Sequence, residues 1–204
     1  RDSSTSRGLG DVYKRQRIGL RQVLNLVLNL RCRTTFSEFG QFRPERQSVS
    51  MMRDLKELNI NDGGRPVKRP PPTDADFLFF EQNTGLLVPP DLRCLLMFSN
   101  GGGPELDAVG GASGAFSIDT FFHLTSDDFG TESMWYAVKH WRPILGDFAL
   151  PFGQDGGGNQ FFLDLSVDPP RVNLCLHDES MRILNISASF EEFVNSLELD
   201  PDMI

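Results

Sequence analysis

Three short segments in the C-terminal half carry a large apolar residue at every second position, and this pattern restricts the fold more than any other feature of the chain. They are 147–153 ("DFALPFG"), 160–166 ("QFFLDLS") and 171–178 ("RVNLCLHD"). A side-chain period of two is typical of β-strands, in which such residues share one face. The turn-forming sequences "QDGGGN" and "VDPP" separate them, so the pattern predicts an antiparallel run of strands. A further strand can follow in 181–187 ("MRILNIS").

Helix-forming segments lie on both sides of these strands. Apolar residues recur at helical spacing in 51–58, 73–84, 91–99, 131–141 and 189–197. The segment 115–124 ("AFSIDTFFHL") instead alternates like a strand. Thr73 and Asp91 are suitable N-caps, Ser189 opens a capping box, and the fourth helix is expected to end before Pro143. We therefore expect one α+β domain, with an antiparallel or mixed sheet of about four to six strands flanked by helices.

The N-terminal quarter differs in charge from the rest of the chain. Residues 1–50 carry ten Lys and Arg against four Asp and Glu, a net charge of +6; the whole chain carries −8, so residues 51–204 carry −14. Residues 1–16 have neither helical nor strand spacing, and "DVYKRQ" within them corresponds to a reading frame of the mosaic-end adapter used in transposase-based sequencing libraries. We interpret 1–16 as translated adapter, with a disordered basic tail as the alternative.

Residues 17–50 are interpreted as an upstream non-native or disordered segment. Their apolar run is short and is interrupted by asparagines, whereas a membrane-spanning helix needs roughly 20 apolar residues. An amphipathic N-terminal helix is the alternative. We expect translation to start at Met51 or Met52, so that the domain spans 51–204 and follows a disordered N-terminal extension.

The charge of −14 on residues 51–204 restricts the partners that this domain can bind. Nucleic acid is disfavoured because its phosphate backbone requires a basic patch, and an anionic membrane surface is disfavoured for the same reason. A basic protein partner is favoured. Cys94 and Cys175 each lie among apolar residues, which is typical of buried thiols in a reducing, cytoplasmic setting.

None of the chemistry-bearing residue types forms a recognisable catalytic or metal pattern. The loop "QDGGGNQ" lacks the Lys and Ser or Thr that follow a phosphate-binding loop, and it lacks the alternating Asp and Asn of a calcium loop. His123, His140 and His177 fall on different elements, and Cys175 with His177 lacks the two further ligands of a zinc site. Aromatic residues near 135–141 are interpreted as core. We therefore expect no enzyme activity, no metal and no cofactor.

Taken in order, several motifs resemble the SUKH superfamily, which contains Smi/Knr-type cell-wall regulators and bacterial toxin-immunity proteins. They are "PPDLRCLLMFSNGG", "DGGGNQFFLDL", "VNLCLHDE" and "SFEEFVNSL", and the resemblance covers roughly residues 66–199. Val88 stands where that family typically has leucine. The structural motif positions are Pro89, Asn100, Gly101, Gly102, Asp155, Gly156, Gly157, Gly158 and Asn159. Residues 51–204 are thus expected to form a SUKH-like domain.

The resemblance implies a non-enzymatic module that binds a protein partner. Together with the charge, it leads us to expect a bacterial immunity-like protein whose acidic surface masks the active site of a basic toxin domain. A regulatory scaffold in cell-wall or signalling control is the alternative, and a hydrolytic enzyme is disfavoured. The candidate partner-binding residues are Asp127, Asp128, Asp178 and Glu179.

Overall fold

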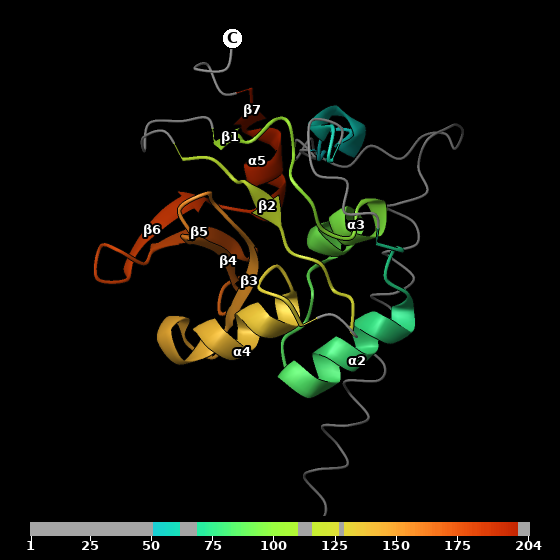
Figure 1. Ribbon diagram of the computed structural model, residues 1–204, viewed down its shortest axis with the longest axis vertical. Helices are drawn as coiled ribbons and strands as arrows, with labels where there is room; N and C mark the ends of the chain where they lie inside the picture. The colour runs from blue at the N-terminus through green and yellow to red at the C-terminus, as the bar shows by residue number, and fades with distance from the viewer. Residues whose placement is uncertain (1–50, 62–68, 110–115, 127–128, 200–204) are drawn as a thin grey trace, which may run out of the picture. The chain divides into compact units, whose positions relative to one another are not determined.

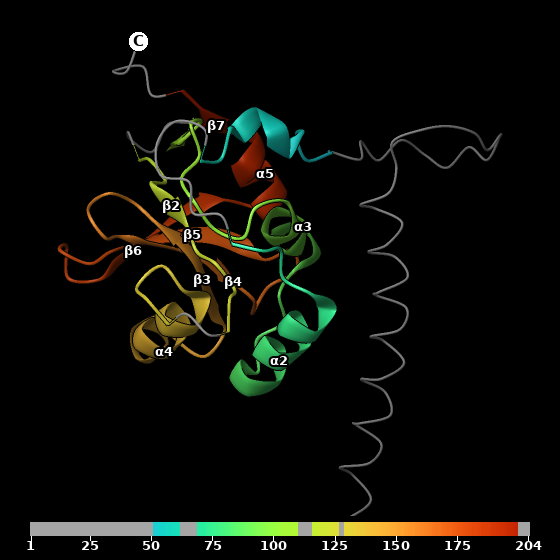
Figure 2. The ribbon, with the colours of Figure 1, turned by 45° about the vertical axis from the view of Figure 1, so that its right-hand side comes forward.

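A five-stranded antiparallel sheet organises the described part of the chain (Figures 1 and 2). The computed structural model describes residues 51–61, 69–109, 116–126 and 129–199. They all belong to one of the two units into which the chain divides, Ser48–Ile204. The expectations for 1–50 lie outside the described residues.

The strands of the large sheet follow the order β2-β3-β4-β5-β6, and each neighbouring pair is antiparallel. Their bounds are Thr120–Phe121 (β2), Ala149–Gln154 (β3), Gln160–Asp164 (β4), Arg171–Leu176 (β5) and Arg182–Ser187 (β6). The predicted run of antiparallel strands, including the fourth strand, is therefore confirmed. A second sheet pairs β1 (Ala108–Val109) with β7 (Leu197–Glu198), which the sequence pattern did not indicate.

The segment expected to alternate as a strand, 115–124, contributes only the two residues of β2. Its remaining backbone groups bond to several different segments. Ile118 donates its N–H to the carbonyl of Asp107 at 2.9 Å, and Phe122 donates to Phe152 at 2.8 Å. The extended segment bonds to a different neighbouring segment at successive residues, so no continuous ladder of hydrogen bonds to one strand forms along it.

The helices are η1 (Leu55–Leu58, a 3₁₀ turn), α2 (Asp74–Thr84), α3 (Pro90–Phe98), α4 (Met134–Leu145) and α5 (Phe190–Asn195). The expected stop before Pro143 is wrong, because α4 continues through this proline. Lys139 and Pro143 both lie on the exposed side of α4, where the carbonyl that proline leaves without a donor is open to water. Asp91 is not a cap either: Pro89 takes that position and Pro90 opens the helix, as its preset φ favours.

Aromatic side chains join the inner face of the sheet to the helix α5. The ring centroid of Phe152 lies 5.2 Å from that of Phe190, 5.6 Å from that of Phe193 and 6.3 Å from that of Phe161. Burial of each such side chain contributes roughly 1.5–3 kcal/mol. On the other face, a smaller apolar cluster of Ala149, Phe162 and Cys175 packs against Leu145 of α4. Helices therefore pack against both faces of the sheet.

Candidate functional site

The loop between β3 and β4 is organised by one carboxylate. Asp155 Oδ1 accepts hydrogen bonds from the backbone N–H groups of Gly157 (2.9 Å) and Asn159 (2.8 Å), and Oδ2 accepts from Asn159 Nδ2 at 2.7 Å. Gly158 adopts a φ of 88°, in the left-handed region that glycine enters without strain. The glycine-rich motif is therefore a rigid hairpin loop in which the acidic side chain folds back on its own backbone.

This loop is tied to the neighbouring turn between β5 and β6. Asn159 Oδ1 accepts a hydrogen bond from the backbone N–H of His177 at 3.0 Å, and the ring Nδ1 of His177 lies 3.0 Å from the same oxygen. In the turn, Ser180 and Met181 have φ values of 56° and 60°. Arg182 closes it by donating its N–H to the carbonyl of Glu179 at 3.2 Å. The two loops therefore form one connected end of the sheet.

Five acidic residues lie in the segments that meet at this end, and we call them the acidic rim: Asp107, Asp119, Asp155, Asp178 and Glu179. Backbone hydrogen bonds bring their segments together, because Asp119 donates its N–H to Gln154 at 2.9 Å and Ile118 donates to Asp107 at 2.9 Å. Arg182 offsets part of the charge through an ion pair with Glu179 at 2.5 Å. The ends of the strands β2 to β6 meet here, so residues that are far apart in the sequence belong to one acidic rim.

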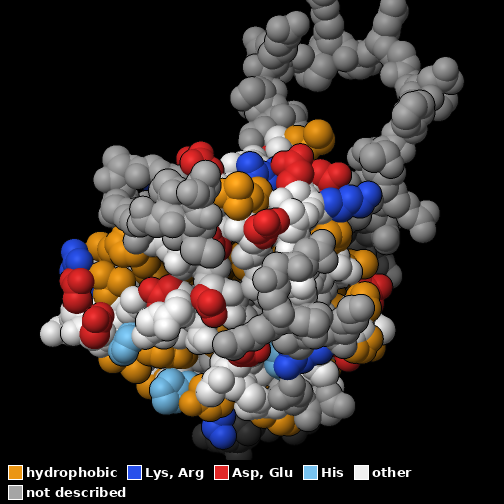
Figure 3. Space-filling model, turned by 45° about the horizontal axis from the view of Figure 1, so that its top comes forward, with side chains coloured by type: hydrophobic (Ala, Val, Ile, Leu, Met, Phe, Trp, Pro, Cys, Tyr) orange, Lys and Arg blue, Asp and Glu red, His pale blue; other side chains and the backbone are white. Residues whose placement is uncertain are grey.

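The described residues as a whole carry an excess of negative charge. These contain nineteen Asp and Glu side chains against eight Lys and Arg, a net charge of −11. Figure 3 shows one face on which acidic side chains are spread between hydrophobic and polar ones, with fewer basic side chains. Such a surface attracts a basic partner over distances of about one Debye length, ~8 Å at physiological salt.

The structure places the predicted partner-binding residues as follows. Asp178 and Glu179 are exposed on the β5–β6 turn, whereas Asp127 and Asp128 lie outside the described residues. Asp107 and Asp119 were missed, since each is an isolated acidic residue in a segment with no charge pattern. Their relation to the loop appears only in the tertiary structure, where Asp119 bonds to Gln154, the neighbour of Asp155, and Asp107 bonds to Ile118, the neighbour of Asp119.

The motif residues around α3 hold the loop that precedes the small sheet. Asn100 is 4 % exposed; its Nδ2 donates to the carbonyl of Pro70 at 2.8 Å, and its Oδ1 accepts from Leu124 N at 2.8 Å. Gly102 has a φ of 119°, and a Cβ there would lie 2.0 Å from Asn61 Oδ1. These positions act in packing and backbone connection, with no side chain presented to a ligand.

Candidate catalytic groups do not come together among the residues that the structure describes. Cys175 is fully buried, and burial raises the pKa of its thiol, so it is a poor nucleophile. His177 is exposed and hydrogen-bonded to Asn159 instead. Within the described ranges, no group of three or more His, Cys, Asp or Glu is placed to hold a metal ion.

Two of the three aromatic residues expected to be core in α4, Trp135 and Trp141, pack against the core, whereas the expectation is wrong for Tyr136. The ring centroid of Trp135 lies 5.0 Å from that of Phe80, and its Nε1 donates to the carbonyl of Leu124 at 3.4 Å. Trp141 is half-buried against the core, while Tyr136 is exposed and stacks on His140. None of the described helices is long and apolar enough to cross a membrane.

Comparison with known proteins assigns the family. Residues 71–196 match the model of the SMI1 / KNR4 family (SUKH-1), which is more than half of the chain. A search of curated proteins found no match. At the family level, the match indicates a module of the toxin-immunity or cell-wall-related kind, and members generally bind proteins without catalysis. The chain therefore belongs to the SMI1/KNR4 family of SUKH domains.

Proposed function

We propose that this chain is a non-enzymatic, immunity-like protein that masks the active site of a basic toxin domain through the acidic rim. Family membership supports a protein-binding module. The observation that carries the choice of surface is the convergence of Asp119, Asp155 and Asp178 at one end of the sheet, through hydrogen bonds that fix their loops. Opposed potentials then accelerate encounter and reject partners of like charge.

The geometry supports masking by a prepared surface. The carboxylate of Asp155 and the amide of Asn159 hold the two loops in one arrangement before a partner arrives, so little conformational entropy is lost on binding. A toxin groove lined by Lys and Arg, such as that of a nuclease, would meet the rim with complementary charge. A regulatory scaffold of the cell-wall branch would use the same surface without blocking an active site.

A capture experiment tests this proposal. The full chain is used as bait in lysate of its source cells, the captured protein is identified by mass spectrometry, and its affinity is measured by titration. The rim variant Asp119→Asn/Asp178→Asn/Glu179→Gln is compared with the matched control Asp74→Asn/Glu132→Gln/Asp147→Asn, which removes three charges elsewhere.

We expect the rim variant to bind the captured protein about tenfold more weakly, mainly through slower association, and the control to change affinity less than about twofold. The bound chain should also inhibit the catalytic activity of the captured protein. Equal weakening by both variants would show that the acidic rim is not the contact. Binding that leaves activity intact would replace masking by the scaffold alternative.

A further inference from the structure

Among the residues that the structure describes, the strand β6 forms an edge of the large sheet. It is the last strand in the order β2-β3-β4-β5-β6, and in Figures 1 and 2 it lies at the outer margin, with none of the labelled elements beyond it. Its residues 182, 183 and 185 are exposed, and Ile183 exposes 51 % of its surface. An exposed edge of this kind is a template for another strand unless its sequence blocks pairing.

The backbone groups that face outward can be assigned from the hydrogen bonds along the sheet. His177 directs its N–H toward the β4 side, to Asn159. Residues of a strand alternate between their two neighbours, so Leu174 and Leu176 face β6. Their partners Leu184 and Arg182 therefore face β5. It follows that Ile183 and Asn185 point their N–H and C=O groups away from the sheet.

This part of the edge is regular. The register shift in the β5–β6 pair lies between Val172 and Asn173, and residues 182–185 pair without interruption. Arg182 is the one basic residue of β6 and is already paired with Glu179. A bulge or an inward-pointing charge commonly prevents another strand from pairing with an edge. The central residues of β6 carry neither a bulge nor an unpaired inward charge.

Acidic residues flank the edge at both ends. Asp178 and Glu179 precede β6, and Glu191 and Glu192 follow it in the first turn of α5. Asp178 and Glu192 are exposed, while Glu179 is paired with Arg182 and Glu192 also accepts the N–H of Ala188 at 2.8 Å. Antiparallel pairing with a second copy would bring the acidic end before β6 in one copy toward the acidic end after β6 in the other, and such like charges destabilise pairing. An extended segment with Lys or Arg at both ends would instead meet favourable charge at each end.

We propose that β6 is a docking edge, to which an extended segment of the protein partner adds as a sixth strand. The segment carries basic residues at its two ends and β-branched residues between them. Its main chain bonds to Ile183 and Asn185, and its basic ends meet the exposed carboxylates of Asp178 before β6 and Glu192 after it. The inference rests on the proposed function only in taking a protein as the partner.

The test uses the full chain, labelled with ¹⁵N, and a defined probe. The probe is the capped peptide Lys-Lys-Thr-Val-Thr-Val-Thr-Lys-Lys, and its control has Glu in place of every Lys. Two protein variants are matched: Ile183→Pro removes the outward N–H, whereas Ile183→Thr keeps it. Amide spectra of the rest of the domain show whether each variant is folded. Should Ile183→Pro not fold, the probe is N-methylated at its central residues and applied to the unaltered chain.

We expect the Lys probe to slow hydrogen exchange at the amides of Ile183 and Asn185 and to shift their resonances. The Glu probe should bind about tenfold more weakly or not at all. Ile183→Pro, or N-methylation of the probe, should weaken binding at least about fivefold, and Ile183→Thr less than about twofold.

Three results would overturn the inference. They are absence of binding by the Lys probe, resonance shifts that map to another surface, and equal binding by the Pro and Thr variants. A dimer in sedimentation that Ile183→Pro abolishes would assign the edge to a second copy instead. The captured partner separates the two proposals: if it binds the Ile183→Pro variant normally and is still inhibited, the docking edge is refuted and the proposed function stands.

Discussion

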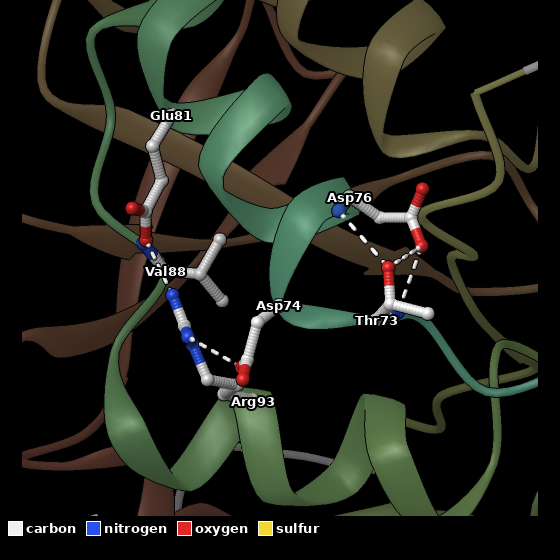
Figure 4. Close-up of polar contacts among 6 residues, drawn as sticks. All are labelled: Thr73, Asp74, Asp76, Glu81, Val88 and Arg93. Atoms are coloured by element: carbon white, nitrogen blue, oxygen red, sulfur yellow. Dashed lines mark hydrogen bonds and ion pairs between the residues drawn. The ribbon is translucent and has the colours of Figure 1, made fainter. Parts of the chain in front are cut away.

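Replacing Arg93 by methionine tests the ion pair that joins α2 to α3. The guanidinium donates to Glu81 Oε1 at 2.9 Å (Figure 4). It also lies 4.2 Å from the ring centroid of Phe77. Glu81 Oε1 also accepts the backbone N–H of Val88 at 3.1 Å. The side chains of Arg93 and Glu81 are only 14 % and 8 % exposed, so each charge depends on the other for compensation.

The expected loss follows from this burial. Breaking a buried pair by removing one partner costs about 3–5 kcal/mol, and we expect Arg93→Met to lower the free energy of unfolding by about 3 kcal/mol, because water still reaches the pair. Glu81→Gln keeps the acceptor for Val88 and should cost about 1–3 kcal/mol. The double variant removes both charges, so it should be more stable than the sum of the single losses by at least ~1 kcal/mol.

Urea unfolding, followed by circular dichroism for the four proteins of this double-mutant cycle, measures these quantities. Asp74→Asn is the matched control, since Asp74 lies 3.7 Å from Arg93 but its side chain is 94 % exposed. It should change stability by less than about 0.5 kcal/mol. A loss below about 1 kcal/mol for Arg93→Met, or strict additivity in the cycle, would refute the view that the pair is a coupled, desolvated unit.

Three further predictions concern single sites. Met181→Gly should stabilise the chain by about 1 kcal/mol in urea unfolding, because φ is 60° at Met181 and only glycine adopts it without strain; a loss of stability would contradict this. Hydrogen bonds from Thr73 lower the pKa of Asp76 in the folded chain. The ionised Asp76 side chain therefore stabilises the fold above its unfolded pKa of about 3.9, and this stabilisation is lost as the pH falls through its pKa in the folded chain. Thr73→Ala should therefore cost about 1 kcal/mol at pH 7, a deficit that shrinks below about pH 4; a deficit independent of pH would exclude this link. Cys175, fully buried and with a raised pKa, should react with a thiol reagent more slowly than Cys94 when peptide mapping follows the modification, and the reverse order would show that its cluster opens.

Sequence periodicity was sufficient for local structure wherever neighbouring residues decide it. The apolar residues at every second position in 147–178 predict the strands β3, β4 and β5, and the intervening turn residues make them antiparallel. The pattern does not show that β3 and β4 are buried on both faces. Thr73 likewise determines where α2 begins, because the capping oxygen and its N–H partner lie three residues apart. The α+β class follows from these local signals alone.

The length of α4, the length of β2 and the place of the candidate site depended on tertiary packing, which short-range sequence patterns do not predict. Pro143 stays inside α4 because that side of the helix faces water, and β2 is short because its segment changes partners. Family resemblance and charge favoured a protein-binding module, but the place of the candidate site depended on strand order. The order β2-β3-β4-β5-β6 brings Asp119, Asp155 and Asp178 to one end and leaves β6 as an edge, since hydrogen bonds between distant segments, and not spacing along the chain, determine which side chains become neighbours.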